Sequence, residues 1–165
     1  MKTNTDTFTS LFGSNSPATN TVYTITPHGT TSLNIYCGDN TNGALPITVN
    51  TEYLLTIEAA NLSVTTNLTD KTNNSTTVTN TYSYTINNGD LSTVSNSIYL
   101  FGTHSPSGGA QTSSERIYEF KLWDNDVLVR DMVPVLNGSS VPGMYDKITG
   151  TFYQNLGTGD FTYNS

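Results

Sequence analysis

This sequence of 165 residues is poor in cysteine and in charged residues, and it contains no long apolar run. Cys37 is the only cysteine, so no disulfide can form within the chain. Lys and Arg number 6 against 13 Asp and Glu, and a nucleic-acid partner would need basic residues to displace its counterions. No apolar run could span a bilayer, and residues 1–10 lack the apolar region of a secretory signal. We therefore expect neither a nucleic-acid nor a membrane partner.

Stretches rich in Leu, Ala, Glu and Lys, which would form helices, are almost absent. Thr and Tyr, which favour strands, and Asn, Gly and Ser, which favour turns, take their place. Alternation of apolar and polar residues predicts strands at residues 3–12, 21–26, 32–37, 51–59, 61–68, 76–86 and 96–102. Tyr53, Leu55 and Ile57 share one face of the strand at 51–59, and the short junction to the strand at 61–68 suggests a hairpin. Turn residues predict loops at 13–20, 27–29, 38–43, 70–75, 87–90 and 104–112. This pattern predicts an all-β fold, a two-sheet antiparallel sandwich or jelly roll, in a single domain over residues 1–165.

Residues 115–165 carry the most distinctive pattern in the chain. Two apolar strands flank a tight turn at residues 124–126, whose side chains can bond to their own backbone. Arg130 and Asp131 fall on opposite faces of the second strand, so each of them needs its own partner. Pro134 is expected to close that strand.

Two segments of this stretch carry a family resemblance: residues 116–135, RIYEFKLWDNDVLVRDMVPV, and residues 141–163, VPGMYDKITGTFYQNLGTGDFTY. Their combination resembles the C-terminal half of the laminin-G-like, or concanavalin A-like, jelly rolls of phage virion proteins and bacterial surface proteins. The motifs correspond in order: a strand, a turn, a second strand, a loop, GMYD, another turn, and a Gly-rich approach to a final aromatic strand. The resemblance implies a laminin-G-like jelly roll.

The resemblance also implies an open sheet edge. Domains of this family usually begin with an extra strand, which this chain lacks before residues 3–12, and their first and last strands commonly lie close together. We therefore expect the final strand, with Phe161, Thr162 and Tyr163, to present an unprotected edge. Exposed edges pair with other chains, so a neighbouring subunit is expected to cover this one.

Enzymatic activity is not predicted. Some concanavalin A-like glucanases use carboxylates on one strand, and Glu115 and Glu119 share a strand face, with Glu119 the best single candidate. The glucanase pattern Glu-x-Asp-x-x-Glu is nevertheless absent, because Ile117 and Phe120 stand where carboxylates are needed. The two histidines lie in predicted loops without a partner, and the chain has no nucleophile elbow.

No cofactor is predicted, although calcium binding is possible by resemblance. Related jelly rolls often bind calcium through several oxygen ligands. The candidate ligands are Asp124, Asn125 and Asp126, although a tight turn explains the same residues. The chain has no EF-hand spacing and no Cys/His set for zinc.

Polar loops offer candidate ligand-binding residues for a carbohydrate. Sugar binding uses aromatic platforms with amide and carboxylate groups, and the loop candidates are His28, Asp39, Asn40, His104 and Gln111. Trp123, the only tryptophan, falls within a predicted strand, where core packing is expected.

Two functions follow from these observations. The first is a non-enzymatic structural protein at a phage virion surface, such as a capsid decoration, head-fibre or tail-associated subunit, which forms a homo-oligomer or pairs with other virion or surface subunits. The second is a glycan-binding adhesion module of a bacterial surface or secreted protein. The two overlap, because a virion protein can bind host glycans. Either function places the protein on a virion surface or outside a cell.

Overall fold

The computed structural model of the protein describes residues 11–16, 21–28, 31–37, 40–60, 63–73, 77–83, 99–103, 111–112, 115–156 and 161–163. All regular secondary structure in these residues is β-strand, which confirms the predicted all-β class. Contacts divide the chain into two units, residues 1–115 and residues 116–165, and each is described by itself. The described residues contain no helix that is long and apolar enough to cross a membrane.

The described residues of the first unit form three antiparallel sheets. The largest has five strands in the order β4-β3-β2-β1-β8, and a second has three strands in the order β5-β6-β7. β9 and β10 form a short two-stranded ladder. The strands are β1 (Phe12–Ser16), β2 (Thr21–His28), β3 (Ser32–Cys37), β4 (Asn40–Pro46), β5 (Tyr53–Ala60), β6 (Ser63–Asp70), β7 (Thr77–Ser83), β8 (Tyr99–Leu100), β9 (Gly102–Thr103) and β10 (Gln111–Thr112).

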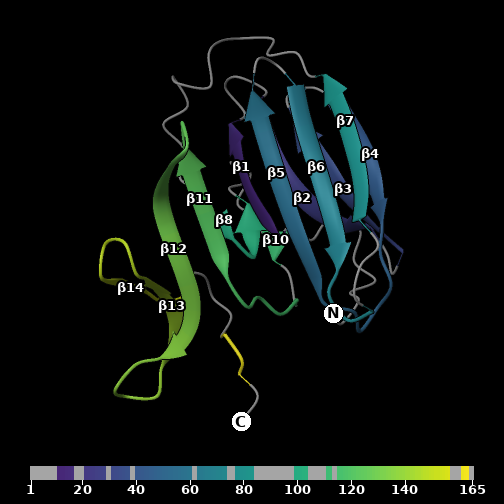
Figure 1. The fold of residues 1–165 in the computed structure, drawn as a ribbon. Helices are drawn as coiled ribbons and strands as arrows, with labels where there is room; N and C mark the ends of the chain where they lie inside the picture. The colour runs from purple at the N-terminus through teal and green to yellow at the C-terminus, as the bar shows by residue number, and fades with distance from the viewer. Residues whose placement is uncertain are drawn as a thin grey trace. The chain divides into compact units, whose positions relative to one another are not determined.

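The two larger sheets of this unit share one apolar core. Figure 1 shows β5, β6 and β7 lying in front of β1 to β4. Alternate residues of β3, β5 and β6 are more buried than their neighbours, as the period of a strand requires, so side chains of both sheets meet between them. The buried core consists of Leu33, Ile35, Leu45, Ile47 and Leu68, with Tyr53, Leu55, Ile57 and Val78 packed against it.

Several predicted strands of this unit agree with the structure. The strand at 32–37 has the predicted bounds, and the predicted inward face of β5 is the half-buried one. β5 pairs with β6 along its whole length in the predicted hairpin. At the tip of the next turn, Asp70 accepts hydrogen bonds from the backbone of Thr72 and Asn73 at 2.8 and 3.0 Å.

Some predicted loops of this unit are strands. Residues 13–16 belong to β1, residues 27–28 belong to β2, and residues 40–43 belong to β4. Gly, Asn and Ser favour turns only locally, and here the neighbouring strands provide ladder partners for the same residues. The remaining predictions for 3–10, for the turn at 87–90 and for the loop at 104–110 fall outside the described residues.

The described residues of the second unit form a four-stranded antiparallel sheet in chain order, β11-β12-β13-β14. Its strands are β11 (Phe120–Asp124), β12 (Val127–Leu136), β13 (Pro142–Asp146) and β14 (Thr151–Tyr153). Asn125 and Asp126 connect the first two strands, with φ angles of 46° and 64°. Positive φ at both central residues is the conformation that two-residue hairpins prefer, and Asn and Asp tolerate it.

Three predictions for the second unit are wrong. β12 continues past Pro134 to Leu136, because Pro134 pairs with Met144 of β13 and lies beyond Met132, the last residue paired with β11, so proline stands at an edge of the sheet. Trp123 is 55% exposed instead of packed in the core, and the pairing of β11 with β12 shifts register between Leu122 and Trp123. Residues 161–163 form no strand.

Candidate functional site

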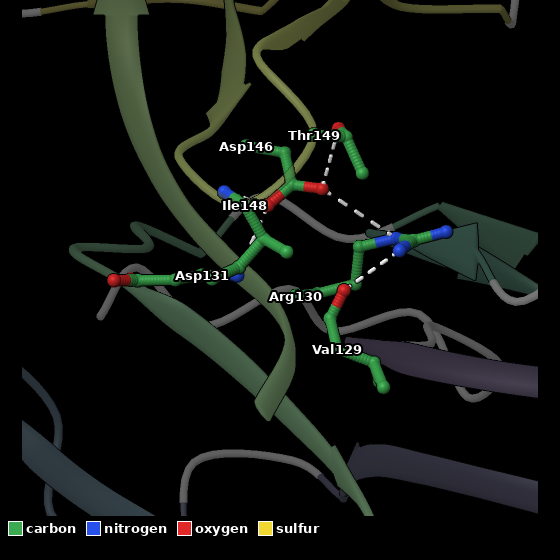
Figure 2. Close-up of polar contacts among 6 residues, drawn as sticks. All are labelled: Val129, Arg130, Asp131, Asp146, Ile148 and Thr149. Atoms are coloured by element: carbon green, nitrogen blue, oxygen red, sulfur yellow. Dashed lines mark hydrogen bonds and ion pairs between the residues drawn. The ribbon is translucent and has the colours of Figure 1, made fainter. Parts of the chain in front are cut away.

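The second unit contains a cluster of polar contacts around Asp146, the last residue of β13 (Figure 2). Its Oδ1 accepts hydrogen bonds from the backbone N–H groups of Asp131 and Ile148, each at 3.1 Å. Its Oδ2 accepts one from the hydroxyl of Thr149 at 2.8 Å. The N–H of Gly150, whose φ is 69°, donates to the Asp146 carbonyl at 2.8 Å. One carboxylate therefore closes the turn between β13 and β14.

Arg130 completes this cluster from β12. Its Nε lies 3.6 Å from Oδ2 of Asp146, and its Nη1 donates to the carbonyl of Val129 at 2.7 Å. Burial raises the pKa of the Asp146 carboxyl, but the hydrogen bonds from the two backbone N–H groups and Thr149, with the charge of Arg130, outweigh it. The pKa of Asp146 is lowered from its ordinary value, so the carboxylate stays ionised at neutral pH.

A second set of charges lies on the opposite face of β12. The carboxylate of Asp131 forms an ion pair with Nζ of Lys147 at 3.0 Å, and Lys121 pairs with Glu119 at the same distance. The hydrogen bond and the charge of Glu119 raise the pKa of Lys121. The expectation that Arg130 and Asp131 each need their own partner is confirmed.

These contacts make the Asp146 cluster a structural element. A general acid or base must come within hydrogen-bonding reach of a substrate proton. The Asp146 side chain has no exposed surface, and groups of the protein already occupy both of its oxygens. The cluster holds the turn, and its burial leaves no place for a substrate at the carboxylate.

A hollow of about 280 Å³ in the same unit offers a different kind of site. Three segments of the chain form it: the start of β13, the residues after β14, and residues 161–163. Among the described residues, its lining combines two aromatic rings, two amide side chains and two small apolar residues, none of them charged: Val141, Pro142, Gln154, Asn155, Phe161 and Tyr163. Such a mixture of apolar surface and a few hydrogen-bonding groups is typical of small-ligand sites.

The predicted metal ligands Asp124, Asn125 and Asp126 form the hairpin turn between β11 and β12. The Asn125 amide donates to Oδ1 of Asp124 at 2.9 Å. Among the residues that the structure describes, no group of three or more His, Cys, Asp or Glu side chains could hold a metal ion. The turn accounts for all three residues, and metal binding there stays a prediction.

The predicted ligand-binding loop residues do not form one described cluster. His28 ends β2, Asn40 begins β4 and Gln111 begins β10, so these three belong to strands instead of loops. Asp39 and His104 lie outside the described residues. Ligand binding by these five residues stays a prediction.

The residues predicted to form an interface edge have a different position in the structure. Phe161 and Tyr163 were expected in an edge strand, but no strand forms there, and both residues line the hollow. Sequence reasoning did not single out the two amides that accompany them, Gln154 and Asn155. The sequence pattern that could have identified them is a pair of amide residues that directly follows the aromatic residues of β14 and shortly precedes Phe161 and Tyr163. No family model matches the chain, and neither the search of curated proteins nor that of solved structures found a match.

Proposed function

We propose that this protein is a non-enzymatic structural subunit of a phage virion surface, built on a laminin-G-like jelly roll. Its role is assembly and surface display, as a capsid decoration, head-fibre or tail-associated subunit. Residues 116–165 form the contact with further copies of the chain. Neither a cofactor nor a catalytic residue is part of this proposal.

The exposure of apolar side chains in the second unit carries the proposal. Among the described residues, every exposed large hydrophobic side chain except Leu54 belongs to residues 116–165: Tyr118, Trp123, Val127, Leu136, Val141, Tyr145, Ile148, Tyr153, Leu156 and Tyr163. Single exposed apolar residues are normal, but so many in one small unit are typical of a surface that binds protein. Aromatic residues such as Trp123 and Tyr118 are also enriched at protein interfaces.

Two further observations support a virion subunit. The motifs of residues 116–135 and 141–163 resemble those of laminin-G-like domains in phage virion proteins. The buried core shared by the five- and three-stranded sheets is compatible with the sandwich that this resemblance implies. The net charge of −7 favours repulsion over non-specific binding to nucleic acid.

A measurement of molar mass tests self-assembly. In light scattering coupled to size exclusion, we expect a multiple of the chain mass of 17.9 kDa. Trp123→Ser and Val127→Ser, at the β11–β12 turn, should each weaken association at least about tenfold, because each removes apolar surface worth roughly 1.5–3 kcal/mol when buried. Leu54→Ser is the matched control in the first unit and should change nothing. A wild-type chain that stays monomeric at all concentrations would contradict the proposal.

The second candidate is a glycan-binding adhesion module, and the hollow beside Phe161 and Tyr163 favours it. Its rings and amides are the groups that bind sugars, and its lining lies entirely in one unit. A glycan array probed with and without calcium separates the two functions. Strong calcium-dependent sugar binding by a monomeric chain would favour the adhesion module over the virion subunit.

A further inference from the structure

We infer that the hollow between β13, β14 and residues 161–163 binds one neutral sugar ring, with Tyr163 as the stacking platform and Gln154 and Asn155 as the hydrogen-bonding groups. This inference rests on the glycan-binding candidate and names its site and its ligand class.

The chemistry of the lining selects the ligand class. A sugar ring presents C–H groups on its faces and hydroxyl groups around its rim, and every hydroxyl both donates and accepts hydrogen bonds. The amides of Gln154 and Asn155 also supply donors and acceptors together, whereas an ammonium group only donates and a carboxylate only accepts. Phe161, Pro142 and Val141 supply apolar surface for the C–H face.

The absence of a basic partner disfavours anionic ligands at this site. None of the described lining residues carries a charge, and the chain as a whole carries −7. A phosphate or carboxylate group would lose its hydration in the hollow without gaining a basic partner among these residues. A sialic acid or a uronic acid is therefore disfavoured relative to a neutral hexose.

Size limits the site to a small part of a glycan. Sites for drug-sized ligands generally measure roughly 300–1,000 Å³. The hollow, at about 280 Å³, falls just below that range, so it accommodates a single ring, such as the terminal residue of a longer chain. Tyr163 is 55% exposed, which leaves surface available for such a contact.

The test begins with a glycan array that carries neutral and sialylated glycans, probed with the full chain in calcium and in a chelator. The tightest neutral glycan is then titrated calorimetrically against four proteins, after their folding has been compared by circular dichroism. Tyr163→Ala should raise Kd about tenfold, and Gln154→Ala about fivefold, because each removes one contact of ordinary strength. Tyr145→Ala removes a tyrosine that is also exposed but does not line the hollow, and it should leave Kd unchanged beside the wild type.

The possible outcomes distinguish a failure of the proposed sugar site from a failure of the glycan-binding function. Calcium-independent binding of neutral glycans that is weakened by Tyr163→Ala and Gln154→Ala supports the inference. Neutral-glycan binding that both variants retain overturns this site while the glycan-binding function stands. Binding that requires calcium overturns the inference, because the described lining residues offer no carboxylate for the metal. Binding of sialylated glycans alone overturns the ligand class, and no binding to any glycan overturns both the inference and the glycan-binding candidate.

Discussion

Nε of Arg130 lies 3.6 Å from Oδ2 of Asp146, whose side chain has no exposed surface, whereas the side chain of Arg130 is 42% exposed. The pair crosses from β12 to β13 at the turn that leads into β14. A charge without exposed surface is tolerated only when hydrogen bonds and an opposite charge replace its hydration, and Asp146 has both. This residue therefore links the last three strands of the sheet.

Removal of the Asp146 carboxylate should destabilise the second unit. In Asp146→Ala, the N–H groups of Asp131 and Ile148 lose their acceptor, so we expect the unfolding midpoint of this unit to fall by at least about 5 °C. Trp123 is the only tryptophan and lies in β11, so its fluorescence reports on this unit. Asp124→Ala, which removes an exposed carboxylate, is the control and should shift the midpoint by less than about 2 °C. Equal shifts in the two variants would show that the buried cluster has no special role.

Acid should weaken the same unit. The pKa of Asp146 is lower in the folded protein than in the unfolded chain, so the unfolded chain binds more protons as the pH falls. The stabilisation is complete above the unfolded value of about 3.9 and is lost as the pH falls through the folded pKa of Asp146.

Melting curves followed by Trp123 fluorescence at a series of pH values measure this loss. The midpoint should stay level between about pH 7 and pH 5 and fall below about pH 4. Asp146→Asn keeps an acceptor oxygen but cannot titrate, so its midpoint should start lower and fall less over the acidic range. A variant that is as acid-sensitive as the wild type would assign the loss to other carboxylates.

Sequence patterns predicted the strands in which burial alternates from residue to residue, and the turns that particular residue types favour. Alternation identified β3 and the inward face of β5 because, in both strands, one face is more buried than the other. The tight turn at 124–126 was also predictable, since Asn125 and Asp126 tolerate positive φ. The requirement for two separate partners at Arg130 and Asp131 followed from their opposite faces on one strand.

Contacts between distant segments were less predictable. Gly13 and Ser14 read as a loop in isolation, but β2 and β8 provide partners for β1. Likewise, the register shift beside Trp123 depends on how β12 pairs with β11. Three separate segments line the hollow, so no single stretch of sequence predicts it. Its aromatic residues Phe161 and Tyr163 were predicted as parts of an interface edge instead. Resemblance predicted a strand at 161–163, and the structure has none there.

Gly143 in β13 should not tolerate a side chain. A Cβ at this position would overlap the carbonyl oxygen of Tyr153 and the ring of Phe152, both in the neighbouring strand β14. Gly143→Ala must displace β14 or the ring, so we expect a loss of about 1–3 kcal/mol in the free energy of unfolding, measured with denaturant and Trp123 fluorescence. Gly138→Ala is the matched control, because a Cβ there has no neighbour within 4 Å, and it should cost less than about 1 kcal/mol. A neutral Gly143→Ala would mean that β14 can shift at little cost.

Leu68 should matter far more than Leu54, although the two residues lie on adjacent strands of one hairpin. Leu68 is 1% exposed and belongs to the core between the two sheets, while Leu54 is 39% exposed on the outer face of β5. Leu68→Ala leaves a cavity among Leu33, Ile35 and Leu45, and should lower the free energy of unfolding by about 2–5 kcal/mol. Leu54→Ala should cost less than about 1 kcal/mol, because water already covers much of its surface. Urea unfolding followed by far-ultraviolet circular dichroism measures both. Equal costs for the two substitutions would contradict a core between the sheets.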